Sequence, residues 1–596
     1  MSVVTALVPS GAMKRAQSNY DKFPSIRVPV GPESVWQGWQ EIVARIAGEI
    51  RLGAQKISVE IYPGVFEDQV LEAFVEGLHP AHVFRTRDCW KTPQEIDAMV
   101  SGDLTDDPVF GRISRLTIED FADPRHTAQL QQACRSAEGV TLILGTGTAL
   151  LAPEPDVLIL ADLARWEIQR RQRANQIGNF PAGDMHESAA AKYKRAFFVD
   201  WRVADRIKQP LIDRINYLLD TNDPAAPKMC TGEDFRAGLR CAVHRPFRVV
   251  PFFDPGPWGG QWMREVCDLP DGPPNYAWCF DCVPEENSLL LDMSGVKIEI
   301  PAMDLVLHRP RELLGDVPFA RFGAEFPIRF DFLDTMQGGN LSLQVHPLNQ
   351  YIIENFGMAY TQDESYYLLD AAPGACVYLG LKTGIDRTAM ISELHRAQEN
   401  GTPFEATNYV NRWPARKHDH FLIPAGTIHC SGANSMVLEI SATPYIFTFK
   451  LWDWGRPGLD GRPRPIHLEH GAANIQWGRD TEWVRKNLLN RIEKIDEGKG
   501  WIEERTGLHE LEFIETRRHR FSSPVEHDAS AGVHVVNLVE GQEAIVESPS
   551  GAFEPFHIHY AETFIVPAKA GRYSIRPADK VAKCATIRAA VRTTAV

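Results

Sequence analysis

Four side chains near the middle of the sequence are candidates for holding a divalent metal ion. Residues 341–347 (LSLQVHP) alternate apolar and polar types, as a strand with one polar face does, so Ser342, Gln344 and His346 should share a face. Glu364 opens a second extended run, and His429 follows a Pro-Ala-Gly turn. One amide oxygen, two imidazoles and one carboxylate suit a cation such as zinc, with room for water or substrate. The alternative is four unrelated polar residues on exposed strand faces.

Length and charge limit the function classes. A chain of 596 residues should form several domains with large cores. The formal net charge of −15 argues against a general nucleic-acid binder. It also requires that a phosphorylated substrate meet a local cluster of Lys or Arg, because the average field of the chain repels it.

The cysteines and the hydropathy pattern indicate a soluble, cytoplasmic protein with no membrane partner. Ten cysteines are scattered among apolar residues, which is typical of reduced core thiols. Cys279 and Cys282 have metal or redox spacing, but no second Cys-x-x-Cys completes a zinc site, so simple burial is predicted. The sequence contains neither a signal-peptide pattern nor a run of 18 apolar residues.

The N-terminal part, residues 1–230, alternates helical patterns with short apolar strands, which predicts a largely parallel α/β sheet. The predicted strands are 56–62, 140–144 and 157–160, and the predicted helices include 69–78 and 163–173. A Pro- and Asp-rich junction near 221–228 marks its end.

This order of elements weakly resembles the uridine-kinase-like P-loop proteins. A phosphate-binding loop needs a Gly-rich backbone and a Lys, whereas residues 62–68 (YPGVFED) contain two acids and no Lys. We therefore expect a kinase-like domain without ATPase activity. Residues 145–148 (GTGT) are expected to form a βα turn rather than a phosphate site.

Beyond residue 245 the sequence changes to short strands between Gly and Pro turns, which predicts an all-β sandwich. A small helical insert is expected at 384–408 and a further helical run at 482–495. The motif FLIPAG at 421–426 returns as FIVPA at 564–568, which indicates two copies of one β unit. The predicted domains are 240–515, with the catalytic site, and 516–596, a degenerate second copy.

The second copy carries His557, His559 and Glu562. On a continuous strand Glu562 would point away from both histidines, so a joint metal site would need a β-bulge. A structural or degenerate site is the prediction, and a second metal is the alternative.

Eight short motifs resemble, in their order, the type I mannose-6-phosphate isomerases, which are zinc-dependent cupin enzymes. They cover about residues 245–596 and are Trp258–Gly260, Phe332–Asp334, Leu341–Pro347, Glu364 with Tyr367–Gly374, Tyr378–Lys382, Ile423–His429, Leu438–Ile440 and Leu451–Arg456. The predicted fold is therefore an N-terminal α/β domain followed by an all-β double cupin.

The resemblance implies roles for individual residues. It implies that Gln344, His346, Glu364 and His429 bind one zinc ion per chain, that Arg456 and Glu439 are catalytic, and that Ser342, Lys382 and Trp258 bind substrate. An ion pair of Arg456 with Asp453 at the surface is the alternative for that arginine. The family usually has Lys two residues before the ligand Glu, whereas this chain has Gln362.

The implied activity is the interconversion of mannose 6-phosphate and fructose 6-phosphate through an enediol or enediolate. Zinc would polarise the substrate oxygens, and either Glu439 or a zinc-bound water would carry the proton. Because of Gln362, the alternatives are a non-catalytic sugar-phosphate sensor or an isomerase of a related sugar phosphate. The sequence carries no signal for the oligomeric state.

Overall fold

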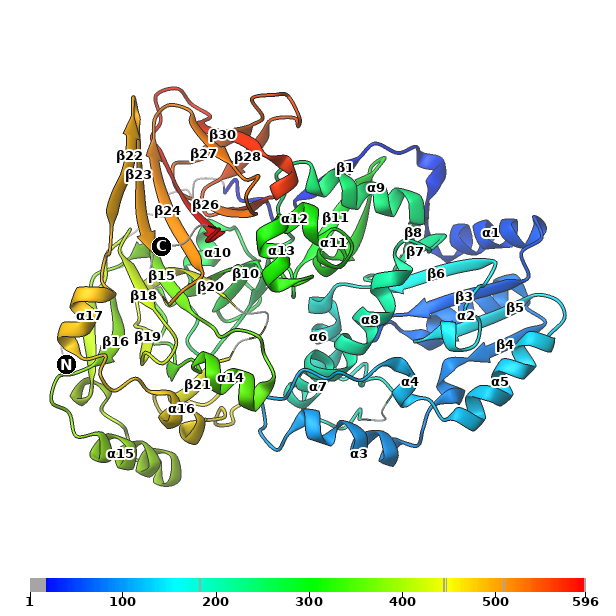
Figure 1. Ribbon diagram of the computed structural model, residues 1–596, viewed down its shortest axis with the longest axis horizontal. Coiled ribbons are helices and arrows are strands. Elements are labelled where there is room, and N and C mark those ends of the chain that lie inside the picture. Colours follow the sequence, from blue (N-terminus) through cyan, green and yellow to red (C-terminus); the bar gives the residue numbers. More distant parts are fainter. Residues whose placement is uncertain are drawn as a thin grey trace, which may run out of the picture.

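The computed structural model describes residues 18–181, 184–442, 445, 447–507, 509 and 511–593. An α/β layer formed by the N-terminal part lies beside two β-sandwiches formed by the rest of the chain (Figure 1). All ten cysteines are free, and Cys279 and Cys282 are buried, as predicted. Of the helices in the described part of the chain, none combines the length and apolar character needed to cross a bilayer.

The α/β layer contains a seven-stranded sheet in the order β2-β8-β7-β6-β3-β5-β4. The five strands from β7 to the β4 edge are parallel, whereas β8 and β2 pair antiparallel at the other end. Strands β5 and β6 are buried along their whole length, which explains their continuous apolar runs. The parallel α/β sheet is thus confirmed, and the kinase-like interpretation stays a prediction. The strands are β2 (Val35–Gln37), β3 (Lys56–Ile61), β4 (His82–Arg85), β5 (Thr141–Gly145), β6 (Val157–Asp162), β7 (Tyr217–Asp220) and β8 (Lys228–Thr231).

Helices cover this sheet on both faces (Figure 1). They are α1 (Gly38–Arg51), α2 (Glu67–Leu78), α3 (Pro93–Leu104), α4 (Ile118–Phe121), α5 (Pro124–Ser136), α6 (Arg165–Arg173), α7 (Ala189–Arg195), α8 (Trp201–Leu211) and α9 (Gly232–Val243).

Backbone N–H groups of the turn at 145–148 bind the side chain of a buried glutamate. The Glu60 carboxylate accepts hydrogen bonds from the backbone N–H groups of Gly147 (2.6 Å) and Thr148 (2.8 Å). Burial raises the pKa of Glu60 to about 7, against the lowering effect of these bonds. In the first turn of α2, Glu67 and Asp68 form ion pairs with Arg85. The amides that could cradle a phosphate are therefore occupied by the protein itself.

The first β-sandwich has a six-stranded sheet in the order β18-β15-β20-β13-β10-β9 and a five-stranded sheet in the order β17-β16-β19-β14-β21. The predicted helical insert is α15 (Arg387–Asn400). The strands are β9 (Phe252–Asp254), β10 (Trp278–Cys282), β13 (Arg329–Asp334), β14 (Leu343–Val345), β15 (Glu364–Ala371), β16 (Cys376–Leu381), β17 (Val410–Pro414), β18 (His420–Ile423), β19 (His429–Ser431), β20 (Ser435–Ser441) and β21 (Phe449–Trp452). The other helices of this part are α10 (Trp262–Val266), α11 (Ala302–His308), α12 (Pro310–Leu314), α13 (Asp316–Phe322), α14 (Asn349–Phe356), α16 (Leu468–Asn474) and α17 (Thr481–Asn487).

The second sandwich repeats the strand order of the first. Its sheets are β22-β23-β24-β31-β26-β29 and β25-β30-β27-β28, so β24 to β31 occupy the same relative places as β13 to β20. The repeated Pro-Ala turn follows β18 in one copy and β29 in the other, both at sheet edges. The strands are β22 (Glu493–Gly498), β23 (Trp501–Gly507), β24 (Ile514–Phe521), β25 (Val525–Asp528), β26 (His534–Glu540), β27 (Glu543–Glu547), β28 (Phe556–His559), β29 (Thr563–Val566), β30 (Arg572–Pro577) and β31 (Cys584–Val591).

One helix prediction was wrong in its extent. The helix expected at 482–495 ends as α17 at Asn487, and β22 begins at Glu493. Residues 493–498 pair with β23 in an antiparallel hairpin, so tertiary pairing overrides their helical periodicity.

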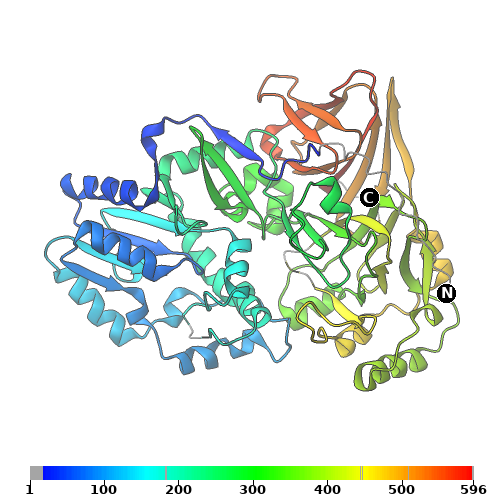
Figure 2. The same ribbon diagram turned by 180° about the vertical axis from the view of Figure 1, so that it is seen from behind.

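The N-terminal segment joins the two halves of the molecule. Strand β1 (Ser25–Val28) pairs in parallel with β11 (Ser288–Met293), which pairs with β12 (Val296–Pro301). Figure 2 shows this blue segment running from the α/β layer along the green strands toward the second sandwich. The N-terminal segment therefore contacts residues that lie far apart in the sequence.

Buried ion pairs join the α/β layer to the β part. Lys208 on α8 lies 2.7 Å from the Asp162 carboxylate and 2.9 Å from that of Asp304 on α11. Its ammonium also lies 4.0 Å from the centre of the Tyr62 ring. All three charged side chains are almost fully buried, so each depends on the others for compensation.

Removing this ammonium should destabilise the protein strongly. Lys208→Met leaves two buried carboxylates without a counter-ion, and we expect a loss of about 3–5 kcal/mol in the free energy of unfolding, measured by urea denaturation. A triple variant that also carries Asp162→Asn and Asp304→Asn has no uncompensated charge and should recover most of this loss. A single variant as stable as the wild type would show that the carboxylates are uncharged in the folded protein.

Candidate metal centre

Three buried side chains from separate strands converge inside the first sandwich. Glu364 is the first residue of β15, and its two carboxylate oxygens lie 3.0 Å from Nε2 of His346 and 2.8 Å from Nε2 of His429. Gln344 on β14 pairs directly with His429 on β19, and its amide lies 3.2 Å from the same imidazole nitrogen. Because the two ends of an amide are interchangeable by rotation, its oxygen can face the same point. The structure thus brings all four predicted ligands together.

Backbone carbonyl groups fix the tautomer of both histidines. Nδ1 of His346 lies 2.7 Å from the Phe447 oxygen, and Nδ1 of His429 lies 2.8 Å from the Thr427 oxygen. Each Nδ1 is therefore the protonated nitrogen, which leaves the Nε2 lone pair directed toward Glu364. This arrangement is the one that metal-binding histidines use.

The donor set fits a divalent metal ion. Nε2 of His346 and Oε1 of Glu364 are buried and make no hydrogen bond of acceptable geometry despite their short separations. Burial raises the pKa of Glu364, but the two histidines outweigh it and hold that pKa well below its usual range. In the described part of the chain, no other group of three His, Cys, Asp or Glu brings its ligand atoms within 4.8 Å of one another.

Gln362 connects Glu364 to the backbone of Phe447. Its amide nitrogen donates to Oε2 of Glu364 at 3.0 Å, and its amide oxygen accepts from the Phe447 backbone N–H at 3.0 Å. The residue that replaces the family Lys therefore holds a ligand in place.

A cavity of about 230 Å³ opens beside Gln344, the one of the four converging residues that lines it. Trp258 and Ser342, both predicted to bind substrate, line it, as do Gln344 and Gln362. Trp278 and Phe280 form the adjoining wall. Most of the other lining residues are charged, namely Asp331, Glu439, Lys450 and Arg464.

Glu439 reaches the cavity from the middle of β20, where it pairs with Asp331 on β13. Burial, together with the nearby carboxylates of Glu364 and Asp331, raises the pKa of Glu439 well above its usual range. Asp331 itself is held by Arg329 at 2.8 Å. The structure therefore places this predicted catalytic carboxyl at the cavity wall in an environment that favours its protonated form.

Two cations in the cavity wall were not predicted from the sequence. Lys450 lies opposite Gln344 on the neighbouring strand β21, and its ammonium has no hydrogen-bond or ion-pair partner among the described residues. Burial, and secondarily Arg464, lowers the pKa of Lys450 to about 8. Arg464 donates to the Ser342 hydroxyl at 2.7 Å and to Asp453 at 2.5 and 2.7 Å. The alternation along β21 could have identified Lys450, but no local pattern marks Arg464.

Arg456 and Lys382 lie outside the lining of this cavity. Arg456 donates to Asp453 at 2.8 Å and to the Asn340 carbonyl. It lines a neighbouring cavity of about 480 Å³ between α15 and the loop after β21, which shares Arg464 with the first cavity. The ion pair considered as the alternative for Arg456 is therefore present. Lys382 follows β16 and is exposed.

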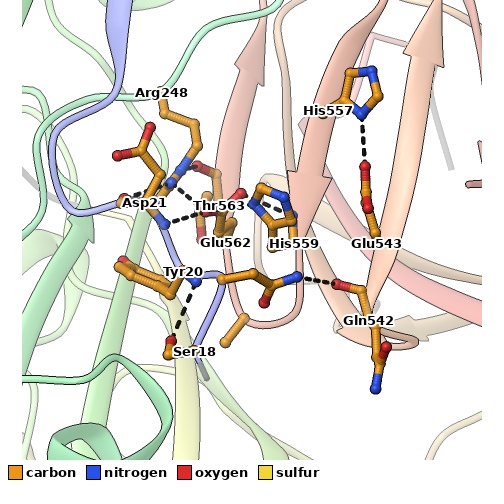
Figure 3. Close-up of polar contacts among 12 residues, drawn as sticks. Ser18, Tyr20, Asp21, Arg248, Gln542, Glu543, His557, His559, Glu562 and Thr563 are labelled. Carbon is orange, nitrogen blue, oxygen red and sulfur yellow. Dashed lines mark hydrogen bonds and ion pairs between the residues drawn. The ribbon is translucent and has the colours of Figure 1, made fainter. Parts of the chain in front are cut away.

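The histidines predicted for the second copy face different carboxylates (Figure 3). Nδ1 of His557 lies 2.6 Å from Glu543, whereas Nδ1 of His559 lies 3.2 Å from Glu562. Glu562 also pairs with Arg248 at 2.7 Å and accepts the Asp21 backbone N–H at 2.7 Å. Glu562 therefore ties the N-terminal segment to the second sandwich, and the three residues do not share a site.

The topological counterpart of the metal centre lies elsewhere in the second copy. By strand order β25, β26 and β30 correspond to β14, β15 and β19, and they carry His527, His534 and Tyr573. The Tyr573 hydroxyl lies 2.8 Å from Nδ1 of His534, and the Arg588 guanidinium lies 3.5 Å from Nε2 of the same ring. A guanidinium thus faces the imidazole nitrogen that would bind a metal, in keeping with a degenerate site.

Comparisons with known proteins divide the chain in the same way. Residues 38–244 match a family model described as a domain of unknown function (DUF8485). The mannose-6-phosphate isomerase of Streptococcus mutans serotype c is 28% identical over 294 residues, which are 48% of this chain and 83% of that protein. The mannose-6-phosphate isomerase ManA of Bacillus subtilis is 28% identical over 236 residues, 39% of this chain and 68% of that protein.

A solved structure, the mannose 6-phosphate isomerase of Bacillus subtilis, aligns over 58% of this chain and 100% of its own. The TM-score is 0.47 and the sequence identity 17%. The chain is a relative of the mannose-6-phosphate isomerases, a family of isomerase enzymes, with about half of its sequence matching them.

Proposed function

We propose that this protein is a zinc-dependent isomerase that interconverts mannose 6-phosphate and fructose 6-phosphate. The observation that carries the proposal is the convergence of His346, Glu364 and His429 next to Gln344, which lines a cavity that also contains Lys450. The Lys450 ammonium has no ion-pair partner among the residues that the structure describes. The substrate is inferred from the sequence relatives, whose names describe them as mannose-6-phosphate isomerases.

One zinc ion would be held by His346, Glu364, His429 and the amide oxygen of Gln344. When bound, zinc polarises substrate oxygen atoms and stabilises the negative charge that develops during isomerisation. The chain holds these ligands through the Phe447 and Thr427 carbonyls and through Gln362. The deep burial of the histidines and Glu364 keeps competing water away from them.

Glu439 is the proposed carrier of the proton between C1 and C2. It lines the cavity near the ligands, and a general acid or base must lie within hydrogen-bond reach of the proton that it moves. In its carboxylate form it can remove the proton from one carbon, and the resulting acid can return it to the other. Trp258 and Trp278 form the apolar side of the cavity and pack edge to face with ring centres 4.7 Å apart.

Lys450 and Arg464 provide the local positive charge that a sugar phosphate needs in a chain of net charge −15. Lys450 is the stronger candidate because its ammonium is unpaired, whereas Arg464 shares the Asp453 carboxylate with Arg456. Arg456 is proposed to act through Asp453, by holding the carboxylate that orients Arg464. Lys450 would offset the loss of the family Lys at position 362.

The second candidate function is a sugar-phosphate sensor without catalysis, and Gln362 is the observation that favours it. In either case the α/β domain is proposed not to hydrolyse ATP, since Glu60 occupies the amides of residues 147 and 148. A cytoplasmic location is proposed from the free cysteines.

Exchange of the C2 proton distinguishes isomerase from sensor. Zinc-loaded protein incubated with mannose 6-phosphate in deuterated water should form fructose 6-phosphate with deuterium at C1, and the reverse reaction should place deuterium at C2 of mannose 6-phosphate, as followed by NMR. Protein that binds zinc and the sugar phosphate, yet leaves the C2 proton in place and makes no ketose, is a sensor.

Loss of one ligand should remove the metal. His429→Ala should lose most of the bound zinc, measured by mass spectrometry of the metal content, and nearly all activity, because a buried ligand nitrogen is missing. His557→Ala is the matched control and should retain both, since His557 pairs with Glu543 in the second sandwich, away from the candidate ligands. Unchanged zinc content in His429→Ala would reject the assigned centre.

The role of Lys450 can be separated from that of Lys382. Lys450→Met should lower kcat/KM about a hundredfold, corresponding to about 3 kcal/mol, because it removes the unpaired charge from the cavity. Lys382→Met removes the same charge from an exposed position and should change kcat/KM little. If Lys382→Met instead has the larger effect, the phosphate binds at the position predicted from the sequence.

A further inference from the structure

A loop of the α/β domain inserts an aromatic side chain among the buried rings of the first sandwich. The loop connects α3 to α4, and in Figure 1 it reaches from α3 toward α14. Phe110, at 1% exposure, lies among five rings of the sandwich. These are His467, Phe447, Phe449, Phe356 and Tyr445, with ring centres 4.8, 5.2, 5.3, 5.7 and 6.4 Å away.

Phe447 is the most consequential of these neighbours. Its backbone carbonyl fixes Nδ1 of His346 at 2.7 Å, and its backbone N–H donates to Gln362 at 3.0 Å. Gln362 in turn donates to Glu364 at 3.0 Å. A single residue therefore orients two of the candidate ligands, one directly and the other through an amide.

Phe110 and Phe447 stack nearly in parallel, with an angle of 16° between the ring planes. We propose that the α/β domain is a structural part of the metal centre and that Phe110 is a positioning residue, which holds the Phe447 backbone where it can orient His346 and Gln362. This role rests on the proposed metal site, and it gives the N-terminal domain a function that needs no ligand of its own.

The loop is built to hold Phe110 rigidly. Asp107 accepts the backbone N–H groups of Val109 and Phe110, each at 2.7 Å, and the Thr105 hydroxyl donates to the Phe110 carbonyl at 2.7 Å. Burial acts to raise the pKa of Asp107, but the neighbouring His470 at 3.6 Å and the two backbone hydrogen bonds outweigh it and lower the pKa to about 2. The carboxylate therefore stays charged at neutral pH.

The sandwich holds the loop from its own side. The Tyr445 hydroxyl donates to the Val109 carbonyl at 3.1 Å, and the Ile113 N–H donates to the Phe356 carbonyl at 3.3 Å. These bonds fix the backbone on both sides of Phe110, so its ring position is determined by both domains.

Another aromatic contact at the same domain boundary provides a matched control. Trp166 on α6 stacks on Phe252 with ring centres 6.0 Å apart and donates to the Ser288 hydroxyl. In the described part of the chain, neither Phe252 nor Ser288 hydrogen-bonds to a candidate ligand. Loss of Trp166 should therefore loosen the boundary without changing how the ligands are held.

The test is the affinity for Co²⁺ and the visible absorption spectrum of the Co²⁺-loaded full-length chain. Phe110→Ala should weaken Co²⁺ binding about 10- to 100-fold and alter the absorption bands, as loss of a group that orients a ligand does. Phe110→Leu, which fills most of the volume without a planar ring, should show the same changes to a smaller extent. Trp166→Ala should retain the wild-type affinity and spectrum.

Three outcomes would overturn the inference. Wild-type affinity and spectrum in both Phe110 variants would show that the ring does not position the ligands. Equal losses in Trp166→Ala and in the Phe110 variants would show a general effect of loosening the domain boundary. A wild-type chain that binds no Co²⁺ would reject the metal site itself and the inference with it. By contrast, a wild-type chain that binds Co²⁺ but lacks isomerase activity would reject only the proposed reaction and leave the role of Phe110 intact.

Discussion

The first sandwich depends on a buried carboxylate placed between two imidazoles. Glu364 is 1% exposed, and a charge at such a site is costly unless it is compensated. A cation bound jointly by Glu364 and by Nε2 of His346 and His429 would supply that compensation, and both Nε2 atoms are directed toward the carboxylate because backbone carbonyls occupy both Nδ1 atoms. The strands β14, β15 and β19 must therefore keep their register, since a slip of one residue would turn each ligand to the opposite face.

The two sandwiches show that strand order and site chemistry can diverge. Both copies place eight strands in the same relative order, so the second copy has the positions at which a metal centre could be built. It instead carries Tyr573 bonded to His534, with the Arg588 guanidinium near the same imidazole. The same strand order thus accommodates side chains that satisfy each other in place of a converging set of candidate ligands.

Local sequence patterns predicted much of the fold and the four residues that converge in the first sandwich. The alternation at 341–347, the spacing to Glu364 and the turn before His429 define the centre because each lies on a short strand with a simple period. The helical pattern at 482–495 failed where β22 pairs with β23, since pairing across strands is not visible in a local period. Likewise His557 and His559 have a ligand-like spacing, but topology places them on β28, which corresponds to β17 rather than to a ligand strand. Arg464 and Phe110 reach the site from distant loops, so no local pattern could identify them.

The replacement of the family Lys by Gln362 and the presence of the α/β domain are physically connected. A lysine ammonium has three donors and no acceptor, so it could not accept the Phe447 N–H that Gln362 accepts. An amide can donate to Glu364 and accept from Phe447 at the same time, and it therefore joins a ligand to the residue on which Phe110 stacks. Gln362 thus connects a candidate ligand to the neighbouring domain, which a lysine at this position could not do. The cavity still contains an ammonium, that of Lys450, which has no hydrogen-bond or ion-pair partner among the described residues.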